Sequence, residues 1–181
     1  KGNTFHNIHS IFPSILSKLC KEYKVKQFVH LSALGIDKAE NSDYAKSKLE
    51  GEKNILKNFP LSTILRPSVV YSVDDNFTTN LMTLMSRLPV FPIYYSGKTK
   101  FTPIHCSDLT DVIFQVISKN IHSHIIECVG PEILSFKEIL QKLLLLIEKK
   151  RILLPMPLPM ANFMAKFFEL MPKPLLTQDQ I

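Results

Sequence analysis

The chain has 181 residues, of which 45% are hydrophobic and 21% charged, so its composition predicts a folded domain, or part of a larger one, rather than disorder. The formal net charge is +6, but the basic residues are mostly lysines scattered along the chain. Nucleic-acid surfaces cluster arginine and lysine with aromatics, so we expect no nucleic-acid partner. The three cysteines lack CxxC spacing, which argues against a zinc site and a disulfide framework. No apolar run approaches the ~20 residues of a membrane span.

The first seventy residues predict helix, strand, helix and strand. Apolar side chains recur at three- and four-residue steps near the start, which indicates an amphipathic helix that Pro13 should kink or restart. QFVHLSAL then has the character of a buried strand. Ser42 or Asp43 can cap a helix over 44–57, and LSTILRPSVVY supplies the next strand. Together these elements form a βαβ unit, whose two strands should be parallel.

Helices alternate with short strands further along the chain. Helices are predicted over 76–88, 108–119 and 135–150, and HIIECVG is a strand between the last two. Ser135 and Glu138 have the spacing of a capping box.

Two polar residues of interest lie at the start of the helix over 108–119: Asp108 is its first residue, and His105 lies just before it. Ser107 or Asp108 can cap this helix, and His105 is interpreted first as a core or turn residue. A functional role for His105 or Asp108 is the alternative.

The last thirty residues change in character. Prolines 155, 157 and 159 should prevent regular structure, and MANFMAKFFELM then predicts a short helix rich in methionine and phenylalanine. We expect this helix to pack on the parent domain. The alternative, with Lys166 and Lys173 nearby, is peripheral contact with a membrane or docking on a partner protein.

The stretch YAKSK places Tyr44 and Lys48 four residues apart at the start of the predicted crossover helix. A lysine ammonium lowers the pKa of a nearby tyrosine by favouring phenolate, and it can also reach the hydroxyls of a ribose. The same spacing is typical of an exposed aromatic beside a solvated lysine. The preceding strand ends at Leu31-Ser32-Ala33, and ligands bind at the carboxyl ends of strands in open parallel sheets, which favours a functional pair.

Several motifs in this order resemble the second half of an extended short-chain dehydrogenase/reductase: QFVHLSALG, YAKSKLEGE, ILRPSVVYS and FTPIHCSDLTDVI. With PKPLLTQDQI, they are most similar to the atypical subgroup that contains the accessory subunit of respiratory complex I called alpha-subcomplex subunit nine. The resemblance implies an α/β fold, the C-terminal part of a Rossmann-type doubly wound parallel sheet with a smaller α+β substrate-side region. It places the C-terminal half of an NAD(P)-binding domain at 1–76 and the substrate-side region, with interleaved Rossmann elements, at 77–181.

The resemblance also implies a site. Tyr44 would be the acid/base tyrosine, Lys48 its partner, and Ser32 a third catalytic candidate. NAD or NADP would lie against nine residues: Tyr44, Lys48, Leu31, Ser32, Ala33, Arg66, Pro67, Ser68 and Val69. Active members carry a serine where this chain has Ala33, which implies weak turnover or none. No metal is expected.

Three functions are compatible with this resemblance. The first is a dinucleotide-binding accessory subunit of complex I with little or no catalysis, in the cytoplasm or on the matrix side and peripheral on the inner membrane. The second is an active NAD(P)-dependent reductase, epimerase or dehydratase acting on a small molecule such as a nucleotide sugar. The third is a regulator that senses the redox state of the dinucleotide. No GxxGxxG occurs among the five glycines, so we expect the pyrophosphate-binding units upstream of Lys1.

Overall fold

The computed structural model of the chain describes residues 4–39 and 41–156, which divide into two compact units. The first unit takes its described residues from Lys1–Val70 and Ile104–Val129, and the second from Tyr71–Pro103 and Gly130–Ile181. The short strand β3 (Val70–Tyr71) lies where the chain leaves the first unit. The short strand β6 (Ile104–His105) lies where it returns.

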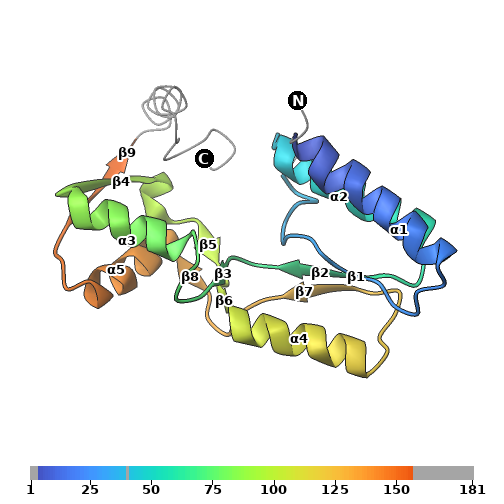
Figure 1. Cartoon of the computed structure of the whole chain (residues 1–181). Coiled ribbons are helices and arrows are strands. Elements are labelled where there is room, and N and C mark those ends of the chain that lie inside the picture. Colours follow the sequence, from blue (N-terminus) through green and yellow to red (C-terminus); the bar gives the residue numbers. More distant parts are fainter. Residues whose placement is uncertain (1–3, 40, 157–181) are drawn as a thin grey trace. The chain divides into compact units, whose positions relative to one another are not determined.

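A parallel sheet in the order β1-β2-β7 organises the first unit. Its strands are β1 (Val29–Leu31), β2 (Thr63–Pro67) and β7 (Ile125–Cys128). β2 is the central strand, and its first four residues are buried. Helix α2 (Asp43–Asn58) lies on one face of the sheet and α4 (Cys106–Ser118) on the other (Figure 1). The predicted α/β class and the parallel βαβ unit are therefore confirmed.

Helix α2 begins and ends where its sequence predicts. The Ser42 hydroxyl accepts a hydrogen bond from the backbone N–H of Ala45 at 3.2 Å, which confirms Ser42 as the cap. Ala45 and Ile55 are buried. The first two turns of α2 thereby carry Tyr44 and Lys48 to the carboxyl end of the sheet.

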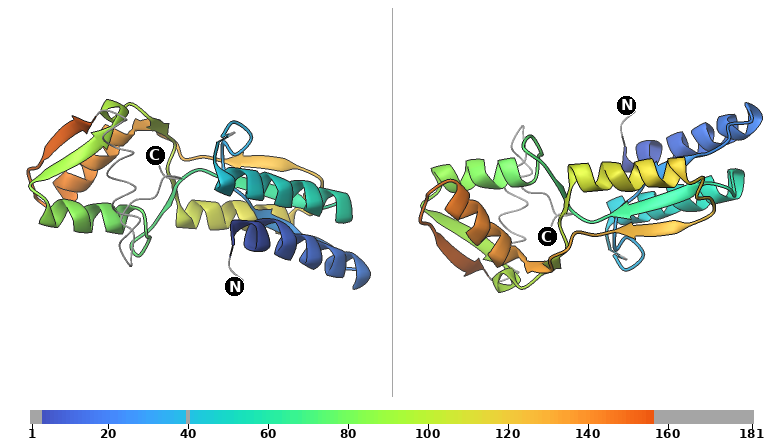
Figure 2. Two further views of the ribbon diagram at one scale, coloured as in Figure 1. Left: turned by 90° about the horizontal axis from the view of Figure 1, so that it is seen from above. Right: turned by 90° about the horizontal axis from the view of Figure 1, so that it is seen from below.

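The amino-terminal helical segment runs beside α2 (Figure 2) and consists of the π-helix η1 (Asn7–Ile11) followed by α1 (Phe12–Glu22). Pro13 lies in the first turn of α1, where its missing N–H has no helical partner to lose. A Cβ on Gly51 of α2 would lie 1.9 Å from the carbonyl oxygen of His9. The absence of a side chain at Gly51 is therefore what lets the two helices approach.

Small polar residues, rather than the predicted apolar stripe, form the contact between α1 and α2. Ser10 and Ser17 are buried, and they accept hydrogen bonds from the side-chain amides of Asn54 and Asn58 at 3.1 and 3.2 Å. The apolar residues of the stripe are exposed: Phe5, Ile8, Phe12, Ile15, Leu16 and Leu19. The periodicity predicted the helix correctly, but the face that packs on α2 is the opposite one.

Helix α4 covers the second face of the sheet through a buried apolar cluster of Leu65, Ile104, Leu109, Val116 and Cys128. Its cap differs from the prediction, because the ring Nδ1 of His105 accepts from the backbone N–H of Ser107 at 3.3 Å. Ser107 and Asp108 instead lie inside the first turn. The interpretation of Asp108 as the cap is therefore wrong, and that position belongs to His105.

In the second unit, the described residues form two helices, a further short helix and two pairs of strands. In chain order these elements are α3 (Thr78–Arg87), β4 (Val90–Tyr94), η2 (Tyr95–Gly97), β5 (Lys100–Phe101), β8 (Leu134–Ser135), α5 (Phe136–Leu146) and β9 (Ile152–Met156). β4 pairs in parallel with β9, and β5 pairs antiparallel with β8. Met85, Phe91, Ile93 and Leu140 are among its buried core residues. The predicted capping box of Ser135 and Glu138 is confirmed at the start of α5.

Strand β9 corrects one expectation from the sequence. Pro155 lies within the strand, opposite Ile93 of β4, although the prolines were expected to prevent regular structure from this point. A proline is tolerated in an edge strand where its missing N–H is not needed for pairing. The predicted helix over 160–171 lies outside the described residues. Across residues 4–39 and 41–156, no helix has the length and apolar character needed to span a bilayer.

Candidate functional site

The predicted pair, Tyr44 and Lys48, lies on the first two turns of α2 with both side chains half-buried. The Nζ atom of Lys48 lies 5.5 Å from the centroid of the Tyr44 ring, a cation–π contact of about 0.5–1 kcal/mol. Lys48 makes no hydrogen bond or ion pair with any residue that the structure describes. Its ammonium therefore has donors to offer to a ligand.

The electrostatics of the pair differ from the sequence expectation. Burial raises the pKa of Tyr44, so the expected lowering by the lysine is wrong. Burial also lowers the pKa of Lys48, although the carboxylate of Glu52 acts in the opposite direction. At neutral pH the phenol of Tyr44 is therefore protonated and acts as a hydrogen-bond donor or acid rather than as a base.

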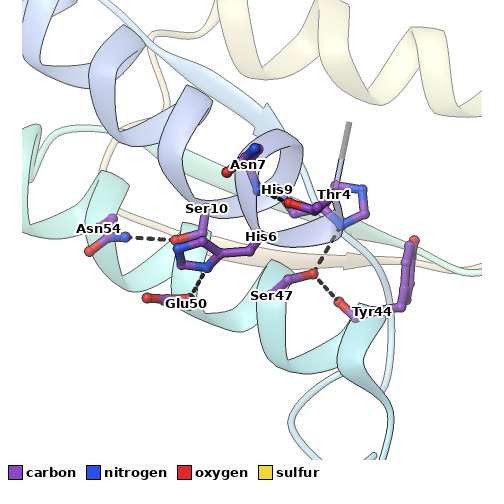
Figure 3. A network of polar contacts seen from close by, with 9 residues as sticks. All are labelled: Thr4, His6, Asn7, His9, Ser10, Tyr44, Ser47, Glu50 and Asn54. Carbon is purple, nitrogen blue, oxygen red and sulfur yellow. Dashed lines mark hydrogen bonds and ion pairs between the residues drawn. The ribbon is translucent and has the colours of Figure 1, made fainter. Parts of the chain in front are cut away.

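Two rings from the amino-terminal segment, those of His9 and Phe5, hold the Tyr44 ring in place. Figure 3 shows His9 beside Tyr44 and Ser47. The His9 ring meets the Tyr44 ring edge to face at 5.2 Å, and the Phe5 ring does so at 5.8 Å. His9 Nδ1 also lies 3.0 Å from the hydroxyl of Ser47 on α2. Burial, and then the charge of Lys48, lower the pKa of His9 and favour its neutral form. Sequence reasoning missed His9 because only the fold brings it beside Tyr44.

Strand β1 contributes His30 and Ser32 on the side of the sheet that α2 covers. Backbone pairing with β2 continues past Leu31, since the N–H of Ser32 donates to the Leu65 carbonyl at 2.7 Å and that of Leu34 to the Pro67 carbonyl at 2.9 Å. Because strand residues alternate between faces, Ser32 shares the side of His30. The Ser32 hydroxyl is buried and has no hydrogen-bond partner among the described residues. Such a group is uncommon in a folded protein and is a candidate for ligand contact.

His30 itself is a neutral neighbour of the lysine. Its pKa is lowered to about 4, mainly by burial and then by the charge of Lys48, while the carboxylate of Glu52 acts in the opposite direction and His9 adds a smaller lowering. The ring also packs at 6.5 Å from that of Phe28. The only signal for His30 in the sequence is its position in a strand that ends at the site.

Arg66 was expected at the nicotinamide end of a cofactor, but its guanidinium is bound to carboxylates. It donates from Nε to Glu52 Oε1 at 3.0 Å and from Nη2 to Glu52 Oε2 at 2.7 Å. The carboxylate of Asp37 lies 3.6 Å from Nη1. Glu52 stands four residues after Lys48, a helical spacing that could have identified it in the sequence.

The remaining predicted residues belong to the strand ends. Pro67 and Ser68 continue the sheet, where the Ser68 N–H donates to the Cys128 carbonyl at 2.9 Å, and the Val69 carbonyl accepts from Ile104 at 2.9 Å. The Leu31 side chain is exposed, and that of Ala33 is half-buried. Contact of any of these residues with a cofactor stays a prediction.

The hydrogen-bond donors of the site match one end of a nicotinamide dinucleotide. The unpaired Lys48 ammonium, the protonated Tyr44 phenol and the unpaired Ser32 hydroxyl come from the head of α2 and the carboxyl end of β1. These are the donors that the ribose and nicotinamide end of such a cofactor requires. The residues present therefore fit that end. The 181 residues contain no glycine-rich fingerprint for the pyrophosphate.

The chain is similar in sequence to subunits of respiratory complex I. It is 26% identical over 162 residues to the mitochondrial NADH dehydrogenase [ubiquinone] 1 alpha subcomplex subunit 9 of Dictyostelium discoideum, a match that covers 89% of this chain and 43% of the relative. It is 24% identical to the mitochondrial NADH-ubiquinone oxidoreductase 40 kDa subunit of Neurospora crassa, with coverages of 83% and 40%. The chain thus spans less than half the length of these relatives.

Solved structures share the fold at lower identity. A dTDP-4-dehydrorhamnose reductase from Clostridium acetobutylicum matches with a TM-score of 0.71 and 20% identity, over 83% of this chain and 57% of that one. UDP-glucuronic acid 4-epimerase from Bacillus cereus, in complex with UDP-glucuronic acid and NAD, matches with a TM-score of 0.67 and 22% identity, over 82% and 54%. These likenesses support the Rossmann-type fold.

A family model decides the membership of the chain. The model described as the RmlD substrate binding domain matches residues 37–142, a range that begins just after β1 and runs into α5. Because this range is more than half of the sequence, the chain belongs to the RmlD substrate binding domain family, of the short-chain dehydrogenase/reductase and epimerase type.

Proposed function

We propose that this chain is part of a mitochondrial accessory subunit of respiratory complex I that binds NAD(H) or NADP(H) and has little or no turnover. The observation that carries the proposal is the half-buried, unpaired ammonium of Lys48 beside Tyr44 at the carboxyl end of a parallel sheet. The relatives that bear complex I names support the assembly and the mitochondrial location, which we propose to be the matrix side.

Lys48 is suited to bind a ribose because its ammonium is partly removed from water without a hydrogen bond or ion pair to any described residue in exchange. That desolvation is the main cause of its lowered pKa. Hydroxyls of a ribose would accept hydrogen bonds from the ammonium and replace the lost hydration. A bound dinucleotide would supply hydride chemistry, while Tyr44 would orient the nicotinamide end with its protonated hydroxyl.

Weak turnover is supported by two features of the site. By the resemblance to extended short-chain dehydrogenases, Ala33 stands where active members usually carry a serine, and alanine offers no hydroxyl to orient a substrate carbonyl. In addition, burial keeps the pKa of Tyr44 above its usual value, which makes the phenolate scarce at neutral pH. The pair is therefore better prepared to hold a cofactor than to transfer protons from a substrate.

A second candidate function is an active reductase or epimerase acting on a small molecule, and Ser32 favours it. The Ser32 hydroxyl lies on the α2 side of the sheet, buried and without a partner among the described residues. It could take the role of the absent serine. A Ser32→Ala variant would then lose turnover of NADH or NADPH, whereas the accessory-subunit proposal predicts no measurable turnover to lose.

Calorimetric titration of the full-length protein with NADH and NADPH tests the binding proposal. We expect Lys48→Met to weaken binding by about tenfold or more, because a charged hydrogen bond contributes about 1.5–3 kcal/mol. Lys46→Met is the matched control, since Lys46 is an exposed lysine on the same helix. Equal affinity in both variants, or no binding by the unsubstituted protein, would refute cofactor binding at Tyr44 and Lys48. Native electrophoresis of mitochondrial extracts tests the assembly, which requires the protein to comigrate with complex I.

A further inference from the structure

The sheet formed by β4 and β9 in the second unit has one buried face and one open apolar face. Phe91 and Ile93 of β4 point into the core, with 6% and 1% of their surfaces exposed. On the opposite face, the paired residues are all apolar or aromatic. This open face consists of three register pairs: Val90 with Ile152, Pro92 with Leu154, and Tyr94 with Met156.

The open face is too apolar to be an ordinary water-facing surface. Val90 is 39% exposed, Ile152 64% and Leu154 48%, while Pro92, Tyr94 and Met156 are half-buried, and no charged residue interrupts the three pairs. In a sheet with one solvated face, polar residues normally alternate with the core residues along each strand. A contiguous apolar patch of this kind indicates a surface that another element covers.

We propose that the open face of β4 and β9 is the docking site of the C-terminal segment of this same chain, through the Met- and Phe-rich stripe of residues 160–171. This inference goes beyond the proposed function and does not depend on cofactor binding. On a helix, the large apolar residues of this stretch fall on one side at three- and four-residue steps: Met160, Phe163, Met164, Phe167, Phe168, Leu170 and Met171.

Connectivity and size favour this occupant. Only residues 157–159 separate the end of β9 from the stripe, and such a short tether gives the segment an effective concentration of about millimolar at the open face. A helix of twelve residues would be about 18 Å long. The five-residue strands β4 and β9 extend about 16–17 Å, so one helix would match the face in length.

The charges of the segment favour docking within the chain over a membrane. The polar side of the predicted helix carries Asn162, Lys166 and Glu169, which together contribute no net charge. Helices that bind anionic membrane surfaces instead carry several lysines or arginines on their polar side. Because this side of the helix has no net charge, it also gives no reason to expect a charged partner protein there.

An introduced tryptophan can report on docking, because these 181 residues contain none and the spectrum of the unsubstituted protein can be subtracted as background. In the full chain carrying Phe167→Trp, we expect short-wavelength tryptophan emission in dilute aqueous solution, as for a buried indole. Adding Ile152→Glu should shift the emission to longer wavelength and reduce the docked-to-undocked ratio by about tenfold or more, since an unpaired carboxylate is costly to remove from water. Leu154→Glu should act in the same way.

Ile133→Glu is the matched control, because Ile133 belongs to the same unit and is 69% exposed but lies outside the two strands. It should leave the emission unchanged, and circular dichroism should show that every variant keeps its secondary structure. Long-wavelength emission in the Phe167→Trp chain would overturn the proposal, as would equal shifts in all variants. Short-wavelength emission only with phosphatidylcholine–phosphatidylserine vesicles, or only in a dimer detected by light scattering, would also overturn it.

Discussion

The buried ion pair between Glu52 and Arg66 should be the most sensitive charged contact in the first unit. Glu52 on α2 has 2% of its surface exposed and binds the guanidinium of Arg66 on β2 through both carboxylate oxygens. The pair therefore links the helix that carries Tyr44 and Lys48 to the central strand of the sheet. We take Glu52→Gln as the perturbation because it keeps the size of the side chain and removes its charge.

The expected loss follows from what the substitution leaves behind. An amide can accept one hydrogen bond from the guanidinium but cannot match both donors, so the Arg66 charge remains buried and poorly paired. Asp37, at 3.6 Å and half-exposed, compensates only weakly. Removing one partner of a buried pair costs about 3–5 kcal/mol, and we expect Glu52→Gln to cost about 3 kcal/mol. This is a large fraction of a typical free energy of unfolding of about 5–15 kcal/mol.

Urea unfolding followed by far-ultraviolet circular dichroism measures this loss, and Glu50→Gln provides the control. Glu50 lies on the same helix in an exposed contact with His6 at 3.1 Å, so its substitution should change the free energy of unfolding by less than about 1 kcal/mol. Replacing both partners by apolar residues, Glu52→Leu with Arg66→Met, should be less destabilising than Glu52→Gln alone. Equal losses for Glu52→Gln and Glu50→Gln would refute the reasoning.

Two further predictions concern the packing around the candidate site. Gly51→Ala should lower the thermal midpoint of unfolding, since the new Cβ would lie 1.9 Å from the His9 carbonyl oxygen. Overpacking of this kind costs about 1–3 kcal/mol, which outweighs the better helix propensity of alanine. An unchanged midpoint would contradict the close approach of the two helices. The His30 pKa of about 4 lies below its usual value, so an unfolded chain binds more protons between about pH 6.5 and 4. The free energy of unfolding should therefore fall by up to about 3 kcal/mol as the pH is lowered through this window. The urea midpoint should be lower at pH 5 than at pH 7, and this difference should be smaller in His30→Phe. An equal pH dependence in both proteins would exclude His30 as its source.

The βαβ unit could be predicted from the sequence because each of its signals is local. Ser42 is a good cap, Pro60 follows the end of the helix, and the strand residues are β-branched or apolar over short runs. Handedness rules then require the two strands to be parallel. The position of Tyr44 and Lys48 at the carboxyl end of the sheet follows from the same rules, so this part of the candidate site needed no structure.

Other features depend on contacts between distant residues and could not be predicted in this way. The apolar stripe of the first helix gave its periodicity but not the face that packs, because Gly51 and the asparagines of α2 select the serine side instead. His9 comes beside Tyr44 only through that packing. Similarly, the guanidinium of Arg66 has a helical carboxylate partner that no strand motif reveals, so a residue expected to face a cofactor is engaged by Glu52.

The groups around Tyr44 also bear on the proposal that this site binds a cofactor but has little or no turnover. To take a proton from a substrate as a base, the tyrosine needs a lowered pKa, but burial raises the pKa of Tyr44. His9 and His30 both have lowered pKa values, so neither supplies a second cation that would favour phenolate at neutral pH. Ribose binding needs none of this, since it requires only the donors of Lys48 in a partly dehydrated position. We infer that selection for cofactor binding alone would preserve the Tyr44 and Lys48 pair, and that turnover would have to come from the Ser32 hydroxyl.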